Sequence, residues 1–472
     1  MKLKNLKTHI LMLTQRTIIL SALWMFTLLG SGLAGGKLLA QQRPTAREEI
    51  KANRYLAGSN YLDYDRAYGL DALTPAPRGY EPFYMSHYGR HGSRWLLSDG
   101  DYLTAIRPLR KAREQGKLSA KGLEVLNQLE QFFRGTRGRL GDLTTVGERQ
   151  HHGIGRRMVE HFPEIFMKKG VKIDARSTVV IRCILSMTAE CEELSSANPT
   201  ARIHNDVSEA LQWYLNAPWR GEVRRQSGKG RAVEDEYRGR WTHPERLCSV
   251  MFTDPQWVQD SIDAGSFMRH LFEVATNMQS HDAELDAAAH IDSHAGEVGD
   301  LLSLFTDEEI YDQWRRVNLG WYQNYGPSPA TGSVMPFSQR HLLKNIIETT
   351  DTVTQVQATL RFGHEVCVMP LACLLELGNC GFASDDWERL DDTWRNYEIF
   401  PMACNVQLIF YRPKKGKSGD VLVKALLNER EVSLPVATDR YPYYRWTDLR
   451  QYYLDKLQRF DELERANQSN QR

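Results

Sequence analysis

The chain has few cysteines for its length, and none of them stands at the close spacing that structural zinc sites use. Seven cysteines occur among 472 residues, and no two form a Cys-x-x-Cys pair. The thiolate ligands of zinc ribbons come in such pairs, so a zinc ribbon is not expected. The first cysteine is Cys183, which leaves no lipid-attachment cysteine near the N-terminus.

An excess of charge of one sign is also absent. The chain has 60 Lys and Arg residues against 59 Asp and Glu residues, a formal net charge of +1. This balance argues against a dedicated nucleic-acid-binding protein, because such proteins carry a broad basic surface. An acidic small molecule would have to be captured by a local basic pocket. The length and a hydrophobic content of 42% are typical of a large globular protein.

Signatures of nucleotide binding are incomplete. Residues 153–155 (Gly-Ile-Gly) lack the third glycine and the preceding strand of a dinucleotide fingerprint. Residues 227–230 (Ser-Gly-Lys-Gly) do not complete a phosphate-binding P-loop. No nucleotide cofactor is therefore expected.

Two pairs of histidines have the chemistry of metal ligands without the full pattern. His151 and His152 lack a spaced third ligand. His290 and His294 stand one helical turn apart, as two ligands on one helix face would, but the glutamate of an HExxH motif is missing. We therefore expect neither pair to bind a metal.

The long hydrophobic run of the chain lies near its N-terminus, from Ile18 to about Gly36. A basic segment, an apolar segment and small residues in that order are typical of a secretory signal, with cleavage after Ala34 or Ala40. The alternative is an uncleaved anchor, because the run is nearly long enough to span a bilayer. We expect residues 1–40 to be a signal peptide and the mature protein to be periplasmic or secreted, without stable membrane insertion. The preceding basic residues are Lys2, Lys4, Lys7 and Arg16.

The segment Ser86–Arg94 carries the strongest chemical signal. His91 stands between Arg90 and Arg94, directly after a short apolar run that predicts a strand. Arginine donates hydrogen bonds in a rigid fork that matches phosphate oxygens, and a neutral imidazole is a competent nucleophile. Two phosphate-binding groups beside one nucleophile predict phosphoryl transfer through the histidine. A solvated polar loop is the alternative interpretation, but Gly92 would let the backbone approach a ligand closely.

Residues Arg90–Arg94 (Arg-His-Gly-Ser-Arg) resemble the RHGxR signature of the histidine phosphatase superfamily. The length of the chain and its later motifs favour the histidine acid phosphatase branch, which contains phytases and multiple inositol polyphosphate phosphatases. The family usually continues with x-Pro, whereas this chain has Trp95 and Leu96. The change affects the shape of the loop more than its chemistry.

Two later segments add to the resemblance. Residues 174–186 are similar to the strand-to-helix segment of the family, in which Arg182 matches the later arginine of the phosphate pocket and Arg176 a structural one. Residues 360–365 match the third motif. Some members have Asp directly after the histidine, and inositol polyphosphate phosphatases have His-Ala-Glu. This chain has His364 and Glu365 without the inserted alanine.

The resemblance implies a mechanism without metal or cofactor. Arg90, Arg94, Arg182 and His364 would bind the phosphate oxygens while His91 attacks phosphorus. Fixed positive donors would stabilise the charge of the transferring group. Glu365 would protonate the leaving oxygen and then deprotonate the hydrolytic water. An alternative role for Glu365 is that of an acid at a helix N-terminus.

The substrate is the more open question. Residues 400–405 and 427–429 look closer to inositol polyphosphate phosphatases than to simple acid phosphatases, so we expect a phytate-like inositol phosphate. Arg134, Arg137 and Arg139 either line a pocket for additional phosphates or form a solvated surface loop.

The alternative functions are a histidine acid phosphatase of broad specificity for small phosphoesters, a phosphotransferase or mutase, and a non-catalytic phosphate-binding relative. We expect a monomer that does not bind nucleic acid.

The pattern along the chain predicts an α/β fold. Strands are expected at 82–85, 172–174, 358–362, 405–411 and 421–427, the last two as a hairpin. Helices are expected at Leu123–Phe133, from Thr144, and after a capping box at 306–309. The charged, glycine-bearing stretch Gln226–Arg240 predicts a loop. Cys373 and Cys380 would pair only if the expected helix ends between them.

The resemblance also implies the domain organisation. A Rossmann-like, mixed or parallel central sheet flanked by helices would be formed by residues 41–198 and 333–472. Residues 199–332 would be an inserted, mostly α-helical cap that covers the active site.

Overall fold

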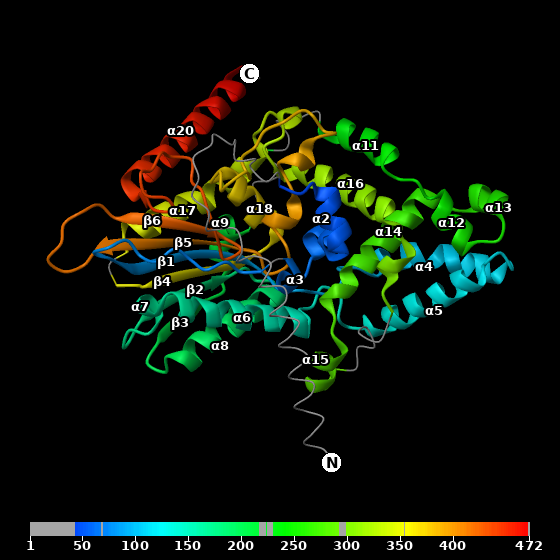
Figure 1. Ribbon diagram of the computed structural model, residues 1–472, viewed down its shortest axis with the longest axis horizontal. Coiled ribbons are helices and arrows are strands. Elements are labelled where there is room, and N and C mark those ends of the chain that lie inside the picture. The colour runs from blue at the N-terminus through cyan, green and yellow to red at the C-terminus, as the bar shows by residue number, and fades with distance from the viewer. Residues whose placement is uncertain are drawn as a thin grey trace, which may run out of the picture. The chain divides into compact units, whose positions relative to one another are not determined.

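A single mixed sheet organises the protein (Figure 1). The computed structural model describes residues 43–67, 69–216, 223, 230–291, 299–353 and 355–470. The expected signal segment 1–40, residues 226–229 of the expected loop and His294 lie outside these residues. Residues 45–472 cluster into one compact unit.

The sheet has the order β3-β2-β4-β1-β5-β6-β7, with β8 paired to β6. The strands β3, β2, β4 and β1 are parallel, and the pairs from β1 onward through β5, β6 and β7 are antiparallel. The bounds of the strands are β1 (Tyr80–Arg90), β2 (Lys172–Ser177), β3 (Arg202–Asp206), β4 (Ala358–Gly363), β5 (Asn405–Pro413), β6 (Leu422–Leu427), β7 (Arg430–Val432) and β8 (Tyr444–Arg445).

Helices precede, separate and follow these strands. Up to β3 they are α2 (Ala46–Ala52), η1 (Arg54–Tyr61), α3 (Tyr64–Ala67), α4 (Asp99–Glu114), α5 (Ala120–Gly135), α6 (Thr145–His161), α7 (Pro163–Phe166) and α8 (Ile181–Ala197). After β4 they are α18 (Glu365–Leu374), η7 (Leu390–Asp392), α19 (Asn396–Ile399) and α20 (Trp446–Asn470).

The described residues between β3 and β4 form a long series of helices. These are η2 (Glu209–Leu211), α9 (Gln212–Leu215), α11 (Gly230–Arg240), α12 (Glu245–Met251), α13 (Pro255–Ser261), α14 (Ala264–Asn277), η3 (Met278–Ser280), α15 (Ala283–Ala288), η4 (Leu301–Leu304), α16 (Asp307–Tyr325), η5 (Pro329–Thr331), η6 (Met335–Gln339) and α17 (Arg340–Asp351).

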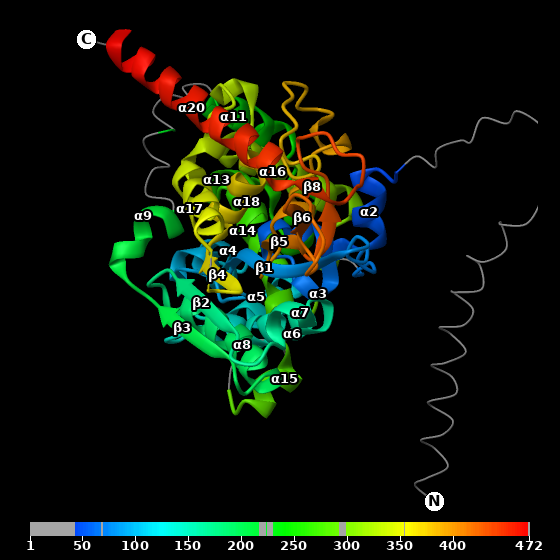
Figure 2. The same ribbon diagram turned by 90° about the vertical axis from the view of Figure 1, so that its left-hand side faces the viewer.

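Helices cover both faces of the sheet, as Figures 1 and 2 show. Alternate residues of β1 enter different cores: Tyr84 and Tyr88 pack with α17, α18 and α20, whereas Met85 packs with α6 and α8. Every residue of β4 is buried. A parallel strand covered on both faces is mostly apolar, and the two polar side chains of β4 are engaged by hydrogen bonds, Thr359 with Tyr84 and Arg361 with Ser86 and Thr349. The predicted fold class is therefore confirmed.

A third hydrophobic cluster is formed by helices and the loop after β1, with no residue of the sheet. It contains residues of α4, α5, α12, α14 and α16, with Trp314 and Phe132 fully buried. These helices lie together beside the sheet in Figure 1. The expected helix N-termini are observed, because Thr144 caps α6 and the capping box of Thr306 and Glu309 begins α16.

One local prediction was wrong. The expected loop at 226–240 contains the helix α11 from Gly230 to Arg240. Its charges are spaced for a helix, since Glu234 and Arg238 form an ion pair one turn apart. Tyr237 is buried, and Glu234 accepts a hydrogen bond from Asn324 of α16. Packing against α16 therefore stabilises a segment whose composition suggested a loop.

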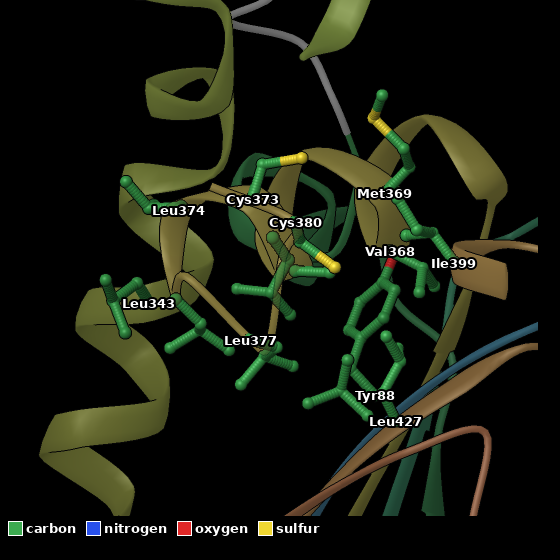
Figure 3. Packing of buried hydrophobic residues seen from close by; sticks show 14 of the residues in the cluster. Tyr88, Leu343, Val368, Met369, Cys373, Leu374, Leu377, Cys380, Ile399 and Leu427 are labelled. Atoms are coloured by element: carbon green, nitrogen blue, oxygen red, sulfur yellow. The ribbon is translucent and has the colours of Figure 1, made fainter. Parts of the chain in front are cut away.

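All seven cysteines are buried free thiols. The helix α18 ends at Leu374, between Cys373 and Cys380, so the condition for their pairing is met, but no disulfide is formed. Figure 3 shows both side chains within the hydrophobic cluster that includes Leu377 and Leu343. Burial raises the pKa of the Cys380 thiol to about 12.

No helix among the described residues is long and apolar enough to cross a membrane.

The loop after β1 packs against the first turn of α6 with almost no space between their backbones. A Cβ atom on Gly147 would lie 2.7 Å from Ser93 N and would overlap Ser93 O. We predict that Gly147→Ala lowers the free energy of unfolding by ~1–3 kcal/mol, because the backbone must shift to relieve the overlap. Denaturant unfolding measures the loss.

Gly100→Ala is the matched control, because Gly100 also lies in the first turn of a helix. Its Cβ would meet Ser98 Oγ at 3.5 Å, an ordinary contact. This control should retain or slightly increase stability, since alanine is the better helix former. Equal stability of the two variants would contradict the close approach at Gly147.

Candidate active site

Three segments meet at the carboxyl edge of the parallel strands. Arg90, the last residue of β1, pairs with Gly363, the last residue of β4, and His91 N donates to Gly363 O at 2.9 Å. Thr178, directly after β2, donates its N–H to Phe362 O at 3.0 Å. The carboxyl edge of a parallel sheet is where α/β proteins gather polar side chains from different strands. The rings of His91 and His364 accordingly lie 5.6 Å apart.

The His91 ring has one engaged nitrogen and one without a partner. Nδ1 lies 2.8 Å from Gly92 O. A carbonyl oxygen can only accept, so Nδ1 carries the proton and the neutral ring keeps a lone pair on Nε2. Nε2 is buried and has no hydrogen-bond partner among the described residues. Burial and the charges of Arg90 and Arg182 hold the pKa of His91 well below its usual value. The ring is therefore a neutral base whose nucleophilic nitrogen faces the Glu365 carboxylate.

Arg90 is oriented by backbone carbonyls. Its Nη1 donates to the carbonyl oxygens of Asn60 at 2.6 Å, Phe400 at 3.2 Å and Pro401 at 3.2 Å. The guanidinium group is fully buried, and its Nη2 has no hydrogen-bond partner among the described residues. A buried donor without a partner is costly, so this nitrogen is suited to an anionic ligand.

Arg94 and Arg182 are held in the same way. Nη1 of Arg94 donates to Trp95 O at 2.8 Å, and Nη1 of Arg182 donates to Gly141 O at 3.3 Å. The buried Nε of each has no partner in the described part of the chain. Burial lowers the pKa of Arg182, and the neighbouring Arg94 acts in the same direction. The three guanidinium groups are thus fixed before any ligand arrives.

Glu365 points its carboxylate at the other site residues. It is the first residue of α18, and its Oε2 lies 3.0 Å from Arg90 Nε and 3.6 Å from His91 Nε2. Burial alone would raise the pKa of Glu365, but the charges of Arg90 and Arg94 lower it to about 2. The free protein therefore holds Glu365 as a carboxylate at neutral and mildly acidic pH.

The position of this carboxylate has a geometric consequence. An atom attacked by Nε2 must approach to about 3–3.5 Å before reaction. Glu365 Oε2 lies at 3.6 Å, within the space that a phosphoryl group would need. Phosphate would have to displace the carboxylate from Arg90, and Glu365 would then flank the group instead of filling its place.

His364 completes the cluster. Burial lowers its pKa to about 4, against the opposing effect of Glu365. Its Nε2 lies 3.4 Å from Thr178 Oγ1. His91, His364 and Glu365 offer ligand atoms within 4.8 Å of one another, which is close enough to hold a metal ion. The three arginines beside them make the potential positive, so the donor set favours an anion over a cation.

The remaining arginines of the sequence analysis lie outside this cluster. Arg176 is engaged by Asp174 and Tyr214. Arg134 is exposed in the last turn of α5, Arg137 is exposed in the turn that follows, and Arg139 is partly exposed in that turn. This turn reaches the site through its backbone, because Gly141 O accepts from Arg182. A role for the side chains of Arg134, Arg137 and Arg139 in specificity stays a prediction.

The sequence analysis missed a buried pair beneath the site. His151 Nε2 lies 3.1 Å from Arg90 O, and His151 Nδ1 lies 3.0 Å from Glu190 Oε2. Both side chains are buried, and burial raises the pKa of Glu190. The pair holds the backbone next to His91. A signal was present in the sequence, since Glu190 lies in the apolar stripe of α8 between Met187 and Leu194.

The helical region also reaches the loop after β1. Asn277 Nδ2 donates to Arg94 O at 3.1 Å. The ring of His281 lies 4.1 Å from that of Trp95. Trp95 follows Arg94 directly, and its ring also lies 5.7 Å from that of Phe132 in α5.

The competition between Glu365 and a bound anion can be measured. We predict that Glu365→Gln tightens the binding of inorganic phosphate by about tenfold, because phosphate no longer displaces a charged group from Arg90. Isothermal titration calorimetry at low ionic strength gives the dissociation constant.

Glu130→Gln is the control for this measurement. It makes the same chemical change in a partly exposed ion pair with Arg110. Its phosphate affinity should equal that of the wild type. Unchanged or weaker phosphate binding in Glu365→Gln would show that the carboxylate does not occupy the anion position.

Comparison with solved structures identifies the fold. No family model and no curated protein sequence matches the chain. The structure is similar to the multiple inositol polyphosphate phosphatase of Bifidobacterium longum in complex with inositol hexasulfate (TM-score 0.67, 17% identity, 84% of this chain and 97% of that chain). It is also similar to the phosphate complex of that enzyme (TM-score 0.63, 19% identity, 85% and 97%). The phytase from D. castellii matches with a TM-score of 0.65 at 15% identity, over 91% and 90% of the two chains. These are proteins of the kind that the sequence motifs resemble, and this chain has their fold.

Proposed function

We propose that the protein is a phosphomonoesterase that works through a covalent phosphohistidine on His91. The observation that carries the proposal is the unpartnered Nε2 of a neutral His91, next to three arginines held by backbone carbonyls. Phosphoryl transfer needs a positioned nucleophile and fixed positive charge around the transferring group, and it needs little else from the protein. The fold shared with phosphatases adds support.

In the first step, the lone pair of His91 Nε2 forms a bond to phosphorus while the bond from phosphorus to the ester oxygen breaks. Unpartnered N–H groups of Arg90, Arg94 and Arg182 donate to the non-bridging oxygens, with His364 beside them. The leaving oxygen takes a proton from Glu365. In the second step, water gives a proton to Glu365 and its oxygen attacks phosphorus, which releases inorganic phosphate and restores His91.

This mechanism requires Glu365 to gain a proton when substrate binds. In the free protein its pKa is about 2 because of the positive charges around it. A phosphate dianion neutralises these charges and brings two negative charges close to the carboxylate. Both effects raise the pKa of a carboxyl group, so the ester itself prepares the proton donor.

Inositol phosphates are the proposed substrates. The support is the fold shared with an inositol polyphosphate phosphatase that binds inositol hexasulfate and with a phytase. Broad activity on small phosphoesters is the alternative outcome of the assay below.

The proposal also includes a cap formed by residues 199–332, supported by the contacts of Asn277 with Arg94 and of His281 with Trp95. Export by residues 1–40 stays a prediction.

The nucleophile can be tested directly. We predict that His91→Ala lowers the release of inorganic phosphate from phytate and from glycerol phosphate by at least about a thousandfold, because the variant lacks the nucleophile that accepts the phosphoryl group. Rapid quenching followed by mass spectrometry should find a phosphoryl adduct on His91 in the wild type.

His204→Ala is the control, since it removes an exposed histidine. Its turnover should be that of the wild type. Release from glycerol phosphate but not from phytate would retain the phosphatase and reject the inositol phosphate substrate. No release from either ester in the wild type would favour a phosphate-binding protein.

The lowered pKa of His91 predicts activity in acid. An ordinary histidine with a pKa of about 6.5 would be roughly 97% protonated at pH 5 and unable to attack. Because the pKa of His91 is held well below this value, we expect kcat/KM to show no loss that titrates between pH 6 and 7 as the pH is lowered.

The phosphate group of the ester titrates in the same pH range, so the pH dependence of kcat/KM is measured with two monoesters whose second pKa values differ. We expect any fall in kcat/KM on the acid side to shift with the second pKa of the ester. A limb near pH 6.5 common to both esters would contradict the neutral state of His91.

A further inference from the structure

A cavity of about 320 Å³ shares its wall with the candidate active site. It is lined by residues 57–61, which include the end of η1, and by residues of α14 and α16. The shared wall consists of Asn60, whose carbonyl accepts from Arg90 Nη1, and Tyr61, whose ring lies 5.5 Å from the guanidinium carbon of Arg94. The far side holds Trp321, whose ring packs at 4.7 Å on Phe400, another residue whose carbonyl binds Arg90.

Two arginines line this cavity without partners. Arg269 of α14 and Arg316 of α16 form no hydrogen bond or ion pair with any described residue, and the buried Nε of Arg316 is unsatisfied. Burial lowers the pKa of Arg316 to about 10, and Arg269 acts in the same direction. The two guanidinium groups are therefore close enough to repel each other.

Other arginines of α16 and of the neighbouring helix α11 are paired. Arg315 binds Glu388, and Arg238 binds Glu234 and Asp235. Paired charge is the usual state for arginines that are partly withdrawn from water, because an uncompensated charge there is costly. Arg269 and Arg316 depart from this pattern at the cavity.

The acidic groups nearby are engaged elsewhere. Glu273 lines the same cavity and accepts a hydrogen bond from Tyr61 OH at 2.8 Å. Asp263 caps the N-terminus of α14 by accepting from Ser266 N. The cavity is therefore left with two unpaired cations against one hydrogen-bonded carboxylate.

A second cavity of about 370 Å³ adjoins the first along Arg316, Val317 and Trp321. Arg316 thus lines both cavities, and its unsatisfied Nε is available to a ligand that enters either of them. The chemistry that satisfies two unpaired guanidinium groups best is a phosphate, whose oxygens accept several hydrogen bonds and supply the missing negative charge.

We propose that Arg269 and Arg316 form a second anion subsite, which holds another phosphate of a polyphosphorylated polyol while its reacting phosphate lies against His91. This inference rests on the proposed function. It assigns substrate preference to α14 and α16 rather than to Arg134, Arg137 and Arg139 at the end of α5 and in the turn after it. A monoester with one phosphate would leave the subsite unused.

The kinetic test compares phytate with glycerol phosphate. In Arg316→Gln and Arg269→Gln, kcat/KM for phytate should fall by at least about tenfold, since each change removes a charged hydrogen bond to substrate. The value for glycerol phosphate should stay within about twofold. Arg316→Lys keeps the charge and should lie between the wild type and Arg316→Gln.

Arg389→Gln is the matched control, because it removes one positive charge from an exposed ion pair with Asp392. It should change neither value, and thermal unfolding checks that all variants are folded. Equal losses for both esters in Arg316→Gln, or no loss for phytate, would overturn the subsite.

A binding experiment separates the subsite from the proposed activity. His91→Ala is titrated with inositol hexasulfate and with inorganic phosphate, with and without Arg316→Gln. We expect Arg316→Gln to weaken hexasulfate binding by at least about tenfold and to leave phosphate binding unchanged. Hexasulfate binding that is absent or insensitive to Arg316 would reject the subsite. If the wild type hydrolyses neither ester and hexasulfate binding depends on Arg316, the proposed activity fails and the subsite stands.

Discussion

Three guanidinium groups of like charge converge on one largely buried pocket, and the backbone carbonyls that accept from them are what makes this arrangement possible. Asn60, Phe400 and Pro401 supply acceptors to Arg90, Trp95 supplies one to Arg94, and Gly141 supplies one to Arg182. Each carbonyl offsets part of the cost of withdrawing a charged group from water. It also fixes the direction in which the remaining donors point.

The electrostatics of the other site residues follow from these charges. Burial and these charges together keep the pKa values of His91 and His364 low, and the charges hold Glu365 as a carboxylate that serves as the counter-ion of Arg90. A site that is positive and already oriented binds an anion with little reorganisation. The same property makes Glu365 a competitor of the phosphate, since both are attracted to Arg90.

The helices between β3 and β4 share a hydrophobic core with α4 and α5, and they contact the site at defined points. Asn277 reaches the carbonyl of Arg94, while Tyr61 of η1 stands between Arg94 and the cavity that contains Arg316. The sheet therefore supplies the residues proposed for chemistry, and the helices beside it supply the two arginines of the proposed subsite.

Much of the site could be predicted from the sequence alone, because its main residues stand within a few positions of strand ends. The strands expected at 82–85 and 358–362 lie within β1 and β4, and His91, Arg94, His364 and Glu365 follow these strands within four residues. The acceptors of Arg90 could not be predicted, since Asn60 and Phe400 are 30 and 310 residues away in the chain. Neither could the pairing of His151 with Glu190, the inward position of the Glu365 carboxylate, or the meeting of Arg269 with Arg316. Local sequence determines which residues end a strand or begin a helix. Only the packing of distant segments decides which charges are left without a partner.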